Sequence, residues 1–447
     1  MTSVFHRLPA RTMPVAVAGD GMYIIDKDGN RYLDGYAGGA CVSCLGHSHP
    51  AVIKAVQSQI SSLAYFHAAM FTSEPLEELG AILATNAPEG LTKVFFVNGG
   101  SEAVETALLM ARQYFVENDQ PERRKVIARR SSYHGASITT LGVGYQIARR
   151  APFQDILPNV FHIAPCYEYR GRLLSETAEQ YGLRVADELE QTILGLGPET
   201  VMAFVAETVT GTTAGAVPPV TGYFRRIREI CDKYGVLLVL DEVFCGLGRT
   251  GTLHACEQDG IAPDLLAVAK GIAAGYQPIG ATLVHQKIYD AIVSGSGTFK
   301  GGYTYSGHAT ACAAAIAVQK VLRADGFLEN VEVKGKLLAS ALKDRFEQHP
   351  NVGDIRGRGL LMTLELVQDR ETKAPFPAER SLSPLIYREA LARGLITHAL
   401  GGTVDGVNGD HIVVCPPLIA GDKDLDTIVG LLGESVDASL SELAVGR

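Results

Sequence analysis

This sequence has no excess of positive charge. Its 447 residues include 40 lysines and arginines against 49 aspartates and glutamates, for a formal net charge of −9 at pH 7. Proteins that bind nucleic acid usually present a basic surface, so the charge gives no support for a nucleic-acid partner. The chain also lacks internal repeats, low-complexity tracts and blocks of like charge, and we therefore expect no disordered tail.

Long apolar runs are missing as well. The longest ones, such as 236–240 and 311–318, are too short or too rich in alanine to cross a bilayer, which takes about 20 apolar residues. Residues 1–14 mix prolines with basic side chains and have no apolar core, unlike a secretory signal. The sequence therefore predicts a soluble protein without a membrane partner.

A second cysteine pair at zinc-binding spacing is also absent. Cys41 and Cys44 have the spacing of a redox or metal-binding pair, but the other six cysteines are scattered. Several lie in apolar runs, where a free thiol behaves as a small core residue. His47 and His49 have no third ligand nearby in the sequence. We expect free thiols, no bound metal and a reducing, cytoplasmic location.

The central part of the chain shows the pattern of an α/β fold. Short apolar runs alternate with amphipathic stretches, which is typical of a mostly parallel sheet covered by helices. Most runs are continuously apolar, as expected for strands that are buried on both faces. The expected strands are 93–97, 125–129, 201–206, 236–240, 265–269 and 280–284, with helices over 102–115 and 224–233.

The two ends of the chain follow a different pattern. Residues 19–36 predict a short antiparallel meander with its turn at 28–30. Later in the chain we expect a helix over 331–348, strands at 360–366, 394–398 and 412–415, and a helix over 425–443. We expect residues 1–60 to pack with residues 326–447 as a smaller α+β domain, beside a large domain formed by residues 61–325.

Three chemically distinctive groups follow predicted strands. Asn98-Gly99-Gly100-Ser101 follows one strand, Asp241 ends another, and Lys270 follows a third. Open parallel sheets bind ligands at the carboxyl ends of their strands, and these ends lie at one edge of the sheet. The sequence therefore predicts a single site that contains an anion cradle, an acid and an amine.

Each group also has a plainer interpretation. The glycines could be a phosphate-binding helix start or an ordinary turn with Ser101 as N-cap, and this turn lacks the dinucleotide fingerprint. Lys270 could be a desolvated nucleophile or a lysine that emerges into solvent. A strand ending in Asp-Glu also describes the magnesium-binding strand of nucleotide hydrolases, but the chain has no G-x-x-x-x-G-K-[ST] loop. We reject that last alternative.

Longer motifs make the interpretation specific. The sequence resembles the class III aminotransferases, a fold type I pyridoxal-phosphate family that includes ω-amino acid, ornithine and 4-aminobutyrate aminotransferases. The resemblance covers residues 20–430. The matching stretches are 33–50, Asn98–Ala103, Ser132–Gly135, Asp241–Gly251, Lys270–Gly271 and Gly302–His308.

The resemblance implies pyridoxal 5′-phosphate as the cofactor and three catalytic residues. Lys270 would carry the cofactor as a Schiff base and later move the substrate proton. Asp241 would pair with the ring nitrogen and keep it protonated, which makes the ring an electron sink. Glu207 would lie near the ring hydroxyl. His134 is expected beside the cofactor as a structural hydrogen-bonding residue rather than as an acid–base catalyst.

The resemblance also implies how the cofactor is held. Gly100 and Ser101 would bind its phosphate, Tyr133 would stack on one face of the ring, and Val243 would pack against the other. Thr304 would reach the phosphate from a neighbouring subunit. A homodimer would then be part of the active site.

The substrate pocket is less determined. Related ω-aminotransferases often carry a mobile arginine before the G-D-H-I-x-x-x-P-P-L stretch to bind a substrate carboxylate, but residues 394–411 contain no arginine or lysine. His398 is the only group there that could carry positive charge, and we expect it to line the pocket with Tyr36 and Phe66. Arginines elsewhere could bind the carboxylate instead: Arg170, Arg172, Arg249, Arg356 and Arg358.

The expected reaction is a ping-pong exchange in which an amine displaces Lys270, a ketone or aldehyde leaves, and a keto acid reverses the sequence. The alternative on the same fold is an amino-acid racemase, epimerase or aminomutase, which needs no second substrate. A decarboxylase or a binding protein with a dead site is a weaker alternative, because the lysine, the acid and the phosphate loop are all intact.

Overall fold

A seven-stranded sheet runs through the larger part of the molecule, in the order β4-β10-β9-β8-β7-β5-β6. The computed structural model describes residues 2–445. β10 is antiparallel to both of its neighbours and the other pairs are parallel. The strands are β4 (Leu91–Val97), β5 (Lys125–Arg129), β6 (Phe161–Ile163), β7 (Val201–Glu207), β8 (Leu237–Asp241), β9 (Leu265–Val268) and β10 (Gly280–His285).

The predicted α/β fold is confirmed, and all six expected strands are present. The three-residue strand β6 was not predicted, and neither was the reversed direction of β10. Every residue of β7 is buried, as its continuous apolar run predicts. Alternate β7 side chains point to opposite faces: Ala203 and Val205 join one core cluster, and Phe204 and Ala206 join another.

Helices cover both faces of this sheet. The cluster that contains Val205 is closed by α3 (Gly100–Glu117) and α9 (Gln286–Ser294). The cluster that contains Phe204 is closed by α7 (Ala178–Leu196), α8 (Tyr223–Tyr234) and α10 (Ala309–Leu322). Shorter helices connect these elements: α4 (Ile138–Val143), α5 (Ile147–Arg150), α6 (Glu168–Gly171), η2 (Ala151–Ile156), η3 (Pro198–Thr200), η4 (Ala255–Asp259) and η5 (Lys270–Ile272).

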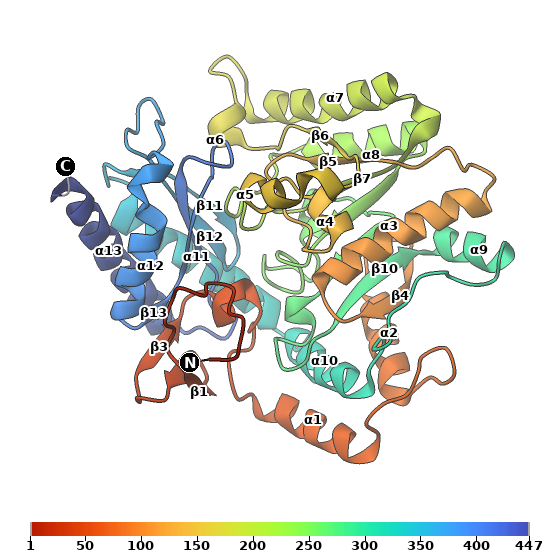
Figure 1. The fold of residues 1–447 in the computed structure, drawn as a ribbon, viewed down its shortest axis with the longest axis horizontal. Helices are drawn as coiled ribbons and strands as arrows, with labels where there is room; N and C mark the ends of the chain where they lie inside the picture. The colour runs from red at the N-terminus through yellow and green to blue at the C-terminus, as the bar shows by residue number, and fades with distance from the viewer. Residues whose placement is uncertain (1, 446–447) are drawn as a thin grey trace.

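The two ends of the chain lie together, as Figure 1 shows by the red N-terminal strands beside the blue C-terminal third. The predicted meander is present, and its last strand, β3, pairs in parallel with β13, with Leu33 opposite Leu395. A second small sheet has the order β11-β12-β15-β14. The strands are β1 (Ala16–Asp20), β2 (Tyr23–Asp26), β3 (Arg31–Asp34), β11 (Val352–Arg358), β12 (Leu361–Leu366), β13 (Leu395–Ile396), β14 (His398–Gly401) and β15 (Asp410–Val414).

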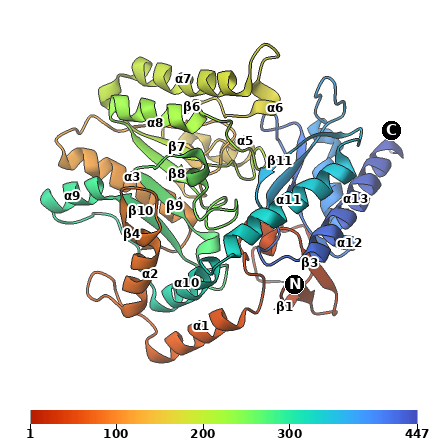
Figure 2. The same ribbon diagram turned by 180° about the vertical axis from the view of Figure 1, so that it is seen from behind.

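The helices of this region connect it to the large sheet. Figure 2 shows α11 (Phe327–Phe346) following α10 and leading toward β11 and α13 (Asp422–Val445). The expected domain boundary after residue 60 falls inside α1 (Pro50–Ser62), which packs on α10 together with α2 (Glu74–Thr85). The division into domains remains a prediction. The other helices here are η1 (Ala37–Cys41), η6 (Ala378–Arg380) and α12 (Leu382–Ala392).

None of the helices in residues 2–445 combines the length and apolar character that a membrane crossing requires. The longest helix, α13, carries charged side chains along its length.

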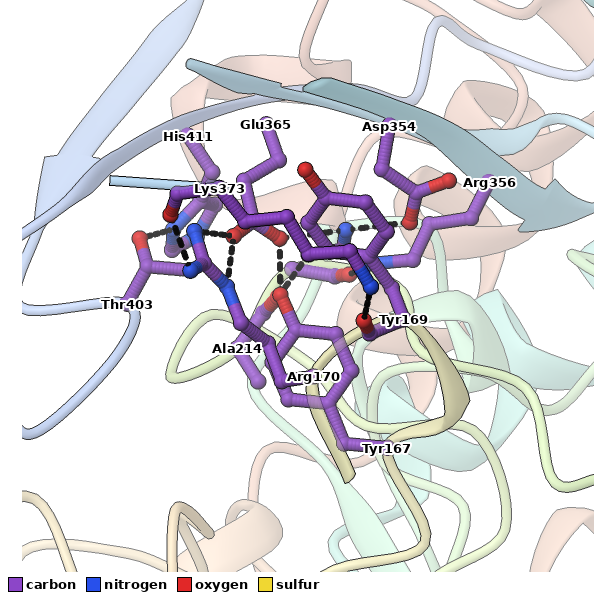
Figure 3. A network of polar contacts seen from close by, with 11 residues as sticks. Tyr167, Tyr169, Arg170, Ala214, Asp354, Arg356, Glu365, Lys373, Thr403 and His411 are labelled. Atoms are coloured by element: carbon purple, nitrogen blue, oxygen red, sulfur yellow. Dashed lines mark hydrogen bonds and ion pairs between the residues drawn. The ribbon is translucent and has the colours of Figure 1, made fainter. Parts of the chain in front are cut away.

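A buried polar network joins the second small sheet to segments that follow β6 and β7 of the large sheet (Figure 3). Glu365 of β12 is fully buried, and its two carboxylate oxygens lie 2.6 Å from Arg170 Nη2 and 2.7 Å from Arg356 Nη1. The Tyr167 hydroxyl also donates to this carboxylate. Arg356 Nε donates to the Gly215 carbonyl at 2.8 Å. The network therefore holds the loop that follows β7 against β11 and β12.

Removing the charge of Glu365 should destabilise the fold. In a Glu365→Gln variant, the half-buried Arg170 would lose its carboxylate partner and the buried Arg356 would keep only the carboxylate of Asp354. Breaking a buried ion pair costs up to about 3–5 kcal/mol. We expect a lower denaturant midpoint and a lower melting temperature than in the wild type. The exposed Glu371→Gln serves as the control and should unfold like the wild type. Equal midpoints for both variants would show that the network contributes little.

Candidate functional site

A cavity of about 800 Å³ lies at the carboxyl ends of β4, β7, β8 and β9. Most of the residues predicted to bind a cofactor line it: Gly100, Ser101, Tyr133, His134, Glu207, Asp241, Val243 and Lys270. A second cavity of about 340 Å³ is lined by none of these residues and shares Gln146 with the first. The predicted acid, amine and anion cradle therefore meet in one place, although they lie up to 170 residues apart in the chain.

Lys270 is the second residue after β9 and begins the short helix η5. Its backbone φ is +46°, which is uncommon for a residue with a side chain and is typical of functional sites that hold a strained conformation. Its Nζ lies 4.6 Å from the ring centroid of Phe244, inside the cavity. The alternative of a lysine that emerges freely into solvent does not fit this position.

Asp241 ends β8 and is held by two hydrogen bonds. Its Oδ2 accepts from His134 Nδ1 at 2.9 Å, and its Oδ1 accepts from the Val243 backbone N–H at 3.0 Å. A carboxylate only accepts, so His134 carries its proton on Nδ1 in this bond. Asp241 is 4% exposed and His134 is 2% exposed. The histidine thus orients the carboxylate, which agrees with a structural role.

Glu207 ends β7 directly opposite Asp241 in the sheet. Its two oxygens accept from the Gly211 N–H at 2.7 Å and the Tyr133 N–H at 3.3 Å. Burial raises the pKa of Glu207, and the charge of Asp241 raises it further. The buried environment therefore favours the protonated form of Glu207.

The anion cradle is the turn between β4 and α3. The N-cap of α3 is Gly99 rather than Ser101, and no side chain caps the helix, so its first N–H groups are free for a ligand. A methyl group on Gly100 would lie 2.6 Å from Val243 Cγ1. At Gly135, where φ is +140°, it would lie 2.7 Å from the Ser101 hydroxyl. These glycines let the backbone approach closely.

Two predicted pocket residues lie together on the far wall of the cavity. The rings of Tyr36 and His398 are stacked, with centroids 4.7 Å apart and an interplanar angle of 28°. Burial lowers the pKa of His398 to about 4, and the charges of Arg149 and Arg7 add to this effect. Burial therefore disfavours the charged form of His398, which the sequence suggests as a possible positive charge of the pocket.

Phe66 and Thr304 do not line the cavity within one chain. Phe66 is buried elsewhere, and Thr304 is exposed on the turn before α10. The hydroxyl of Tyr65 donates to the Thr304 carbonyl at 2.9 Å, so the segments that carry Phe66 and Thr304 are neighbours. Thr304 lies outside the cavity of its own chain. A residue that reaches the site of a neighbouring subunit must lie in such a position.

The arginines suggested by the sequence are engaged elsewhere. Arg170 and Arg356 belong to the Glu365 network, Arg249 donates to the backbone carbonyl of Pro416, and none of the five lines the cavity. The two arginines that do line it, Arg7 and Arg149, were not predicted. Neither lies in a recognisable motif, so only their position in space indicates a role.

The residues present fit pyridoxal 5′-phosphate. The glycine turn offers free N–H groups to a phosphate, the buried Asp241 carboxylate suits a protonated ring nitrogen, and Tyr133 offers an aromatic face. The amine of Lys270 stands in the same cavity. This set of donors matches each charged or aromatic part of that cofactor.

Comparisons with known proteins agree with this interpretation. A family model described as Aminotransferase class-III matches residues 8–436. The chain is 41% identical over 441 residues to an uncharacterized aminotransferase of Schizosaccharomyces pombe, covering 98% of this chain and 96% of that protein. It is 34% identical over 437 residues to the putrescine–pyruvate aminotransferase of Pseudomonas aeruginosa, covering 97% and 92%. The solved structure of the ω-transaminase from Pseudomonas jessenii in complex with PMP has a TM-score of 0.92 at 32% identity, covering 100% and 98%.

Proposed function

Since this chain belongs to the class-III aminotransferases, which use pyridoxal 5′-phosphate, we propose that it transfers an amino group from an amine or ω-amino acid to a keto acid. The exchange would be of the ping-pong type, with the ketone or aldehyde product leaving before the keto acid binds. The observation that carries the proposal is the convergence of Lys270, Asp241 and the Gly100 turn on one cavity. The putrescine–pyruvate enzyme and the ω-transaminase among the relatives support an amine donor.

Each catalytic residue would have a distinct task. The bound cofactor supplies an aldehyde that accepts the amine and a cationic ring that withdraws electrons. Lys270 Nζ would remove and return the proton at the amine-bearing carbon, because no other lysine among residues 2–445 lines this cavity. Asp241, oriented by His134, would keep the ring nitrogen protonated. Glu207 would sit beside the ring hydroxyl.

The binding residues would hold and orient the cofactor. Gly100 and Ser101 would donate to its phosphate at the start of α3. Tyr133 and Val243 would enclose its ring. Enclosure on both faces also excludes water, which strengthens the interaction of the ring with Asp241.

We further propose that the enzyme is a homodimer in which Thr304 reaches the partner's site. Large side chains beside Thr304 are exposed, with Tyr305 59% and Tyr65 40% exposed. The ring of Tyr305 packs against Tyr65, which binds the Thr304 backbone. Exposed apolar side chains that gather in one patch mark an interaction surface.

The proposed compartment is the cytoplasm. All eight cysteines are free and buried, and free thiols persist in reducing compartments.

A panel of amine donors against pyruvate, 2-oxoglutarate and glyoxylate would test the reaction. We expect at least one amine to change the visible absorbance of the bound cofactor without any acceptor and to turn over only when a keto acid is added. Turnover of a chiral amino acid in the absence of a keto acid would instead identify a racemase, epimerase or aminomutase. Failure of every pair, with cofactor bound, would contradict the proposal.

A further inference from the structure

Arg149 is an unpaired arginine at the edge of the site. It lies on the short helix α5, is half-buried, and places its guanidinium carbon 4.9 Å from the ring centroid of Tyr133. In the described part of the chain, residues 2–445, no carboxylate or carbonyl pairs with it. The neighbouring Arg150, by contrast, has a partner: its side chain is buried and donates to the Gly142 carbonyl at 2.8 Å.

The surroundings of Arg149 disfavour its unpaired positive charge. Burial lowers the pKa of Arg149, and the nearby charge of Arg7 lowers it further. The same two arginines lower the pKa of His398, so the three groups are close to one another. Neither acid of the cavity pairs with Arg149, since Asp241 accepts from His134 and Glu207 accepts from backbone N–H groups. A partly desolvated cation without a counter-ion favours an anion from outside.

The position of Arg149 points to a substrate rather than to the cofactor phosphate. The free N–H groups for a phosphate lie at Gly99 and Gly100, at the start of α3. Besides Tyr133, Arg149 shares the cavity wall with Arg7 of the N-terminal segment and with His398 of β14, which stacks on Tyr36. This is the wall that we predicted for the substrate, and its loop at residues 394–411 has no arginine or lysine of its own.

We propose that Arg149 binds the carboxylate of the keto acid and of amino acid donors, with Arg7 adding positive charge beside it. The inference rests on the proposed function and names its substrate class: acceptors with a carboxylate that the planar guanidinium can bind with two parallel hydrogen bonds. An amine donor without a carboxylate makes no use of this contact.

Steady-state kinetics of Arg149→Gln would test the proposal. We expect KM for pyruvate to rise about 10- to 100-fold, since hydrogen bonds to charged groups contribute that much to binding. Butanoate, an unreactive carboxylate, should lose potency as a competitive inhibitor by the same factor. The effect on KM for 1-phenylethylamine should be at least about tenfold smaller. Arg149→Lys keeps the positive charge but not the planar guanidinium. Its KM for pyruvate should lie between those of the wild type and Arg149→Gln.

The control is Arg172→Gln, which changes an exposed arginine paired with Glu168 and should behave like the wild type. Unchanged KM for pyruvate and unchanged inhibition by butanoate in Arg149→Gln would overturn the inference. So would weaker binding of pyridoxal 5′-phosphate, because Arg149 would then be a cofactor anchor. If the wild type fails with every donor, the proposed function fails, and calorimetric binding of 2-oxoglutarate to the holoenzyme still decides the role of Arg149.

Discussion

Replacing Lys270 with alanine should abolish transamination. Within the described chain the cavity offers no second lysine to remove and return the proton at the reacting carbon, and the cofactor would lose its covalent attachment. We expect kcat to fall by about four orders of magnitude or more, because both roles disappear together. Initial rates with the best donor and acceptor, together with the visible absorbance of the dialysed protein, would measure the effect.

The Lys270 result needs a lysine control and a chemical check. Lys423→Ala changes an exposed lysine on α13 and should keep wild-type rates. Borohydride reduction followed by peptide mapping should place the cofactor on residue 270 of the wild type and nowhere on the Lys270→Ala chain. A label on another lysine, or a variant with near-normal turnover, would remove Lys270 from the mechanism.

Replacing Asp241 with asparagine should have the second largest effect. Asparagine has nearly the same shape, but it is neutral and no longer favours a proton on the ring nitrogen. The loss of one preorganised electrostatic contact to the reacting system costs about 10²- to 10³-fold in kcat. Single-turnover rates with an amine donor would isolate this step from product release.

Two comparisons make the Asp241 test specific. Asp325→Asn removes a carboxylate from an exposed loop and should leave the rate unchanged. The far-ultraviolet circular dichroism of Asp241→Asn should match the wild type, because asparagine can keep a hydrogen bond near His134 and Val243. Wild-type rates in a folded, cofactor-loaded Asp241→Asn protein would contradict the role given to this carboxylate.

The sequence suggested five arginines for carboxylate binding, but it does not show which of them are already paired in the folded protein. Arg170 and Arg356 form ion pairs with Glu365, which lies 195 residues from Arg170 in the chain. Charge in the sequence says which groups can bind an anion, but not which of them already have one. Arg149 emerged only because the fold leaves it unpaired beside Tyr133.

The sequence by itself determined the large sheet and the position of its chemistry. A continuous apolar run predicts a buried strand from local properties alone, so the residues that end such runs, Asp241 and Lys270, were placed at the sheet edge without any knowledge of their neighbours. Tertiary structure alone decided the antiparallel direction of β10, the lowered pKa of His398 and the unpaired guanidinium of Arg149. The physical reason is that strand direction, desolvation and ion pairing depend on groups that come close only after the chain has folded.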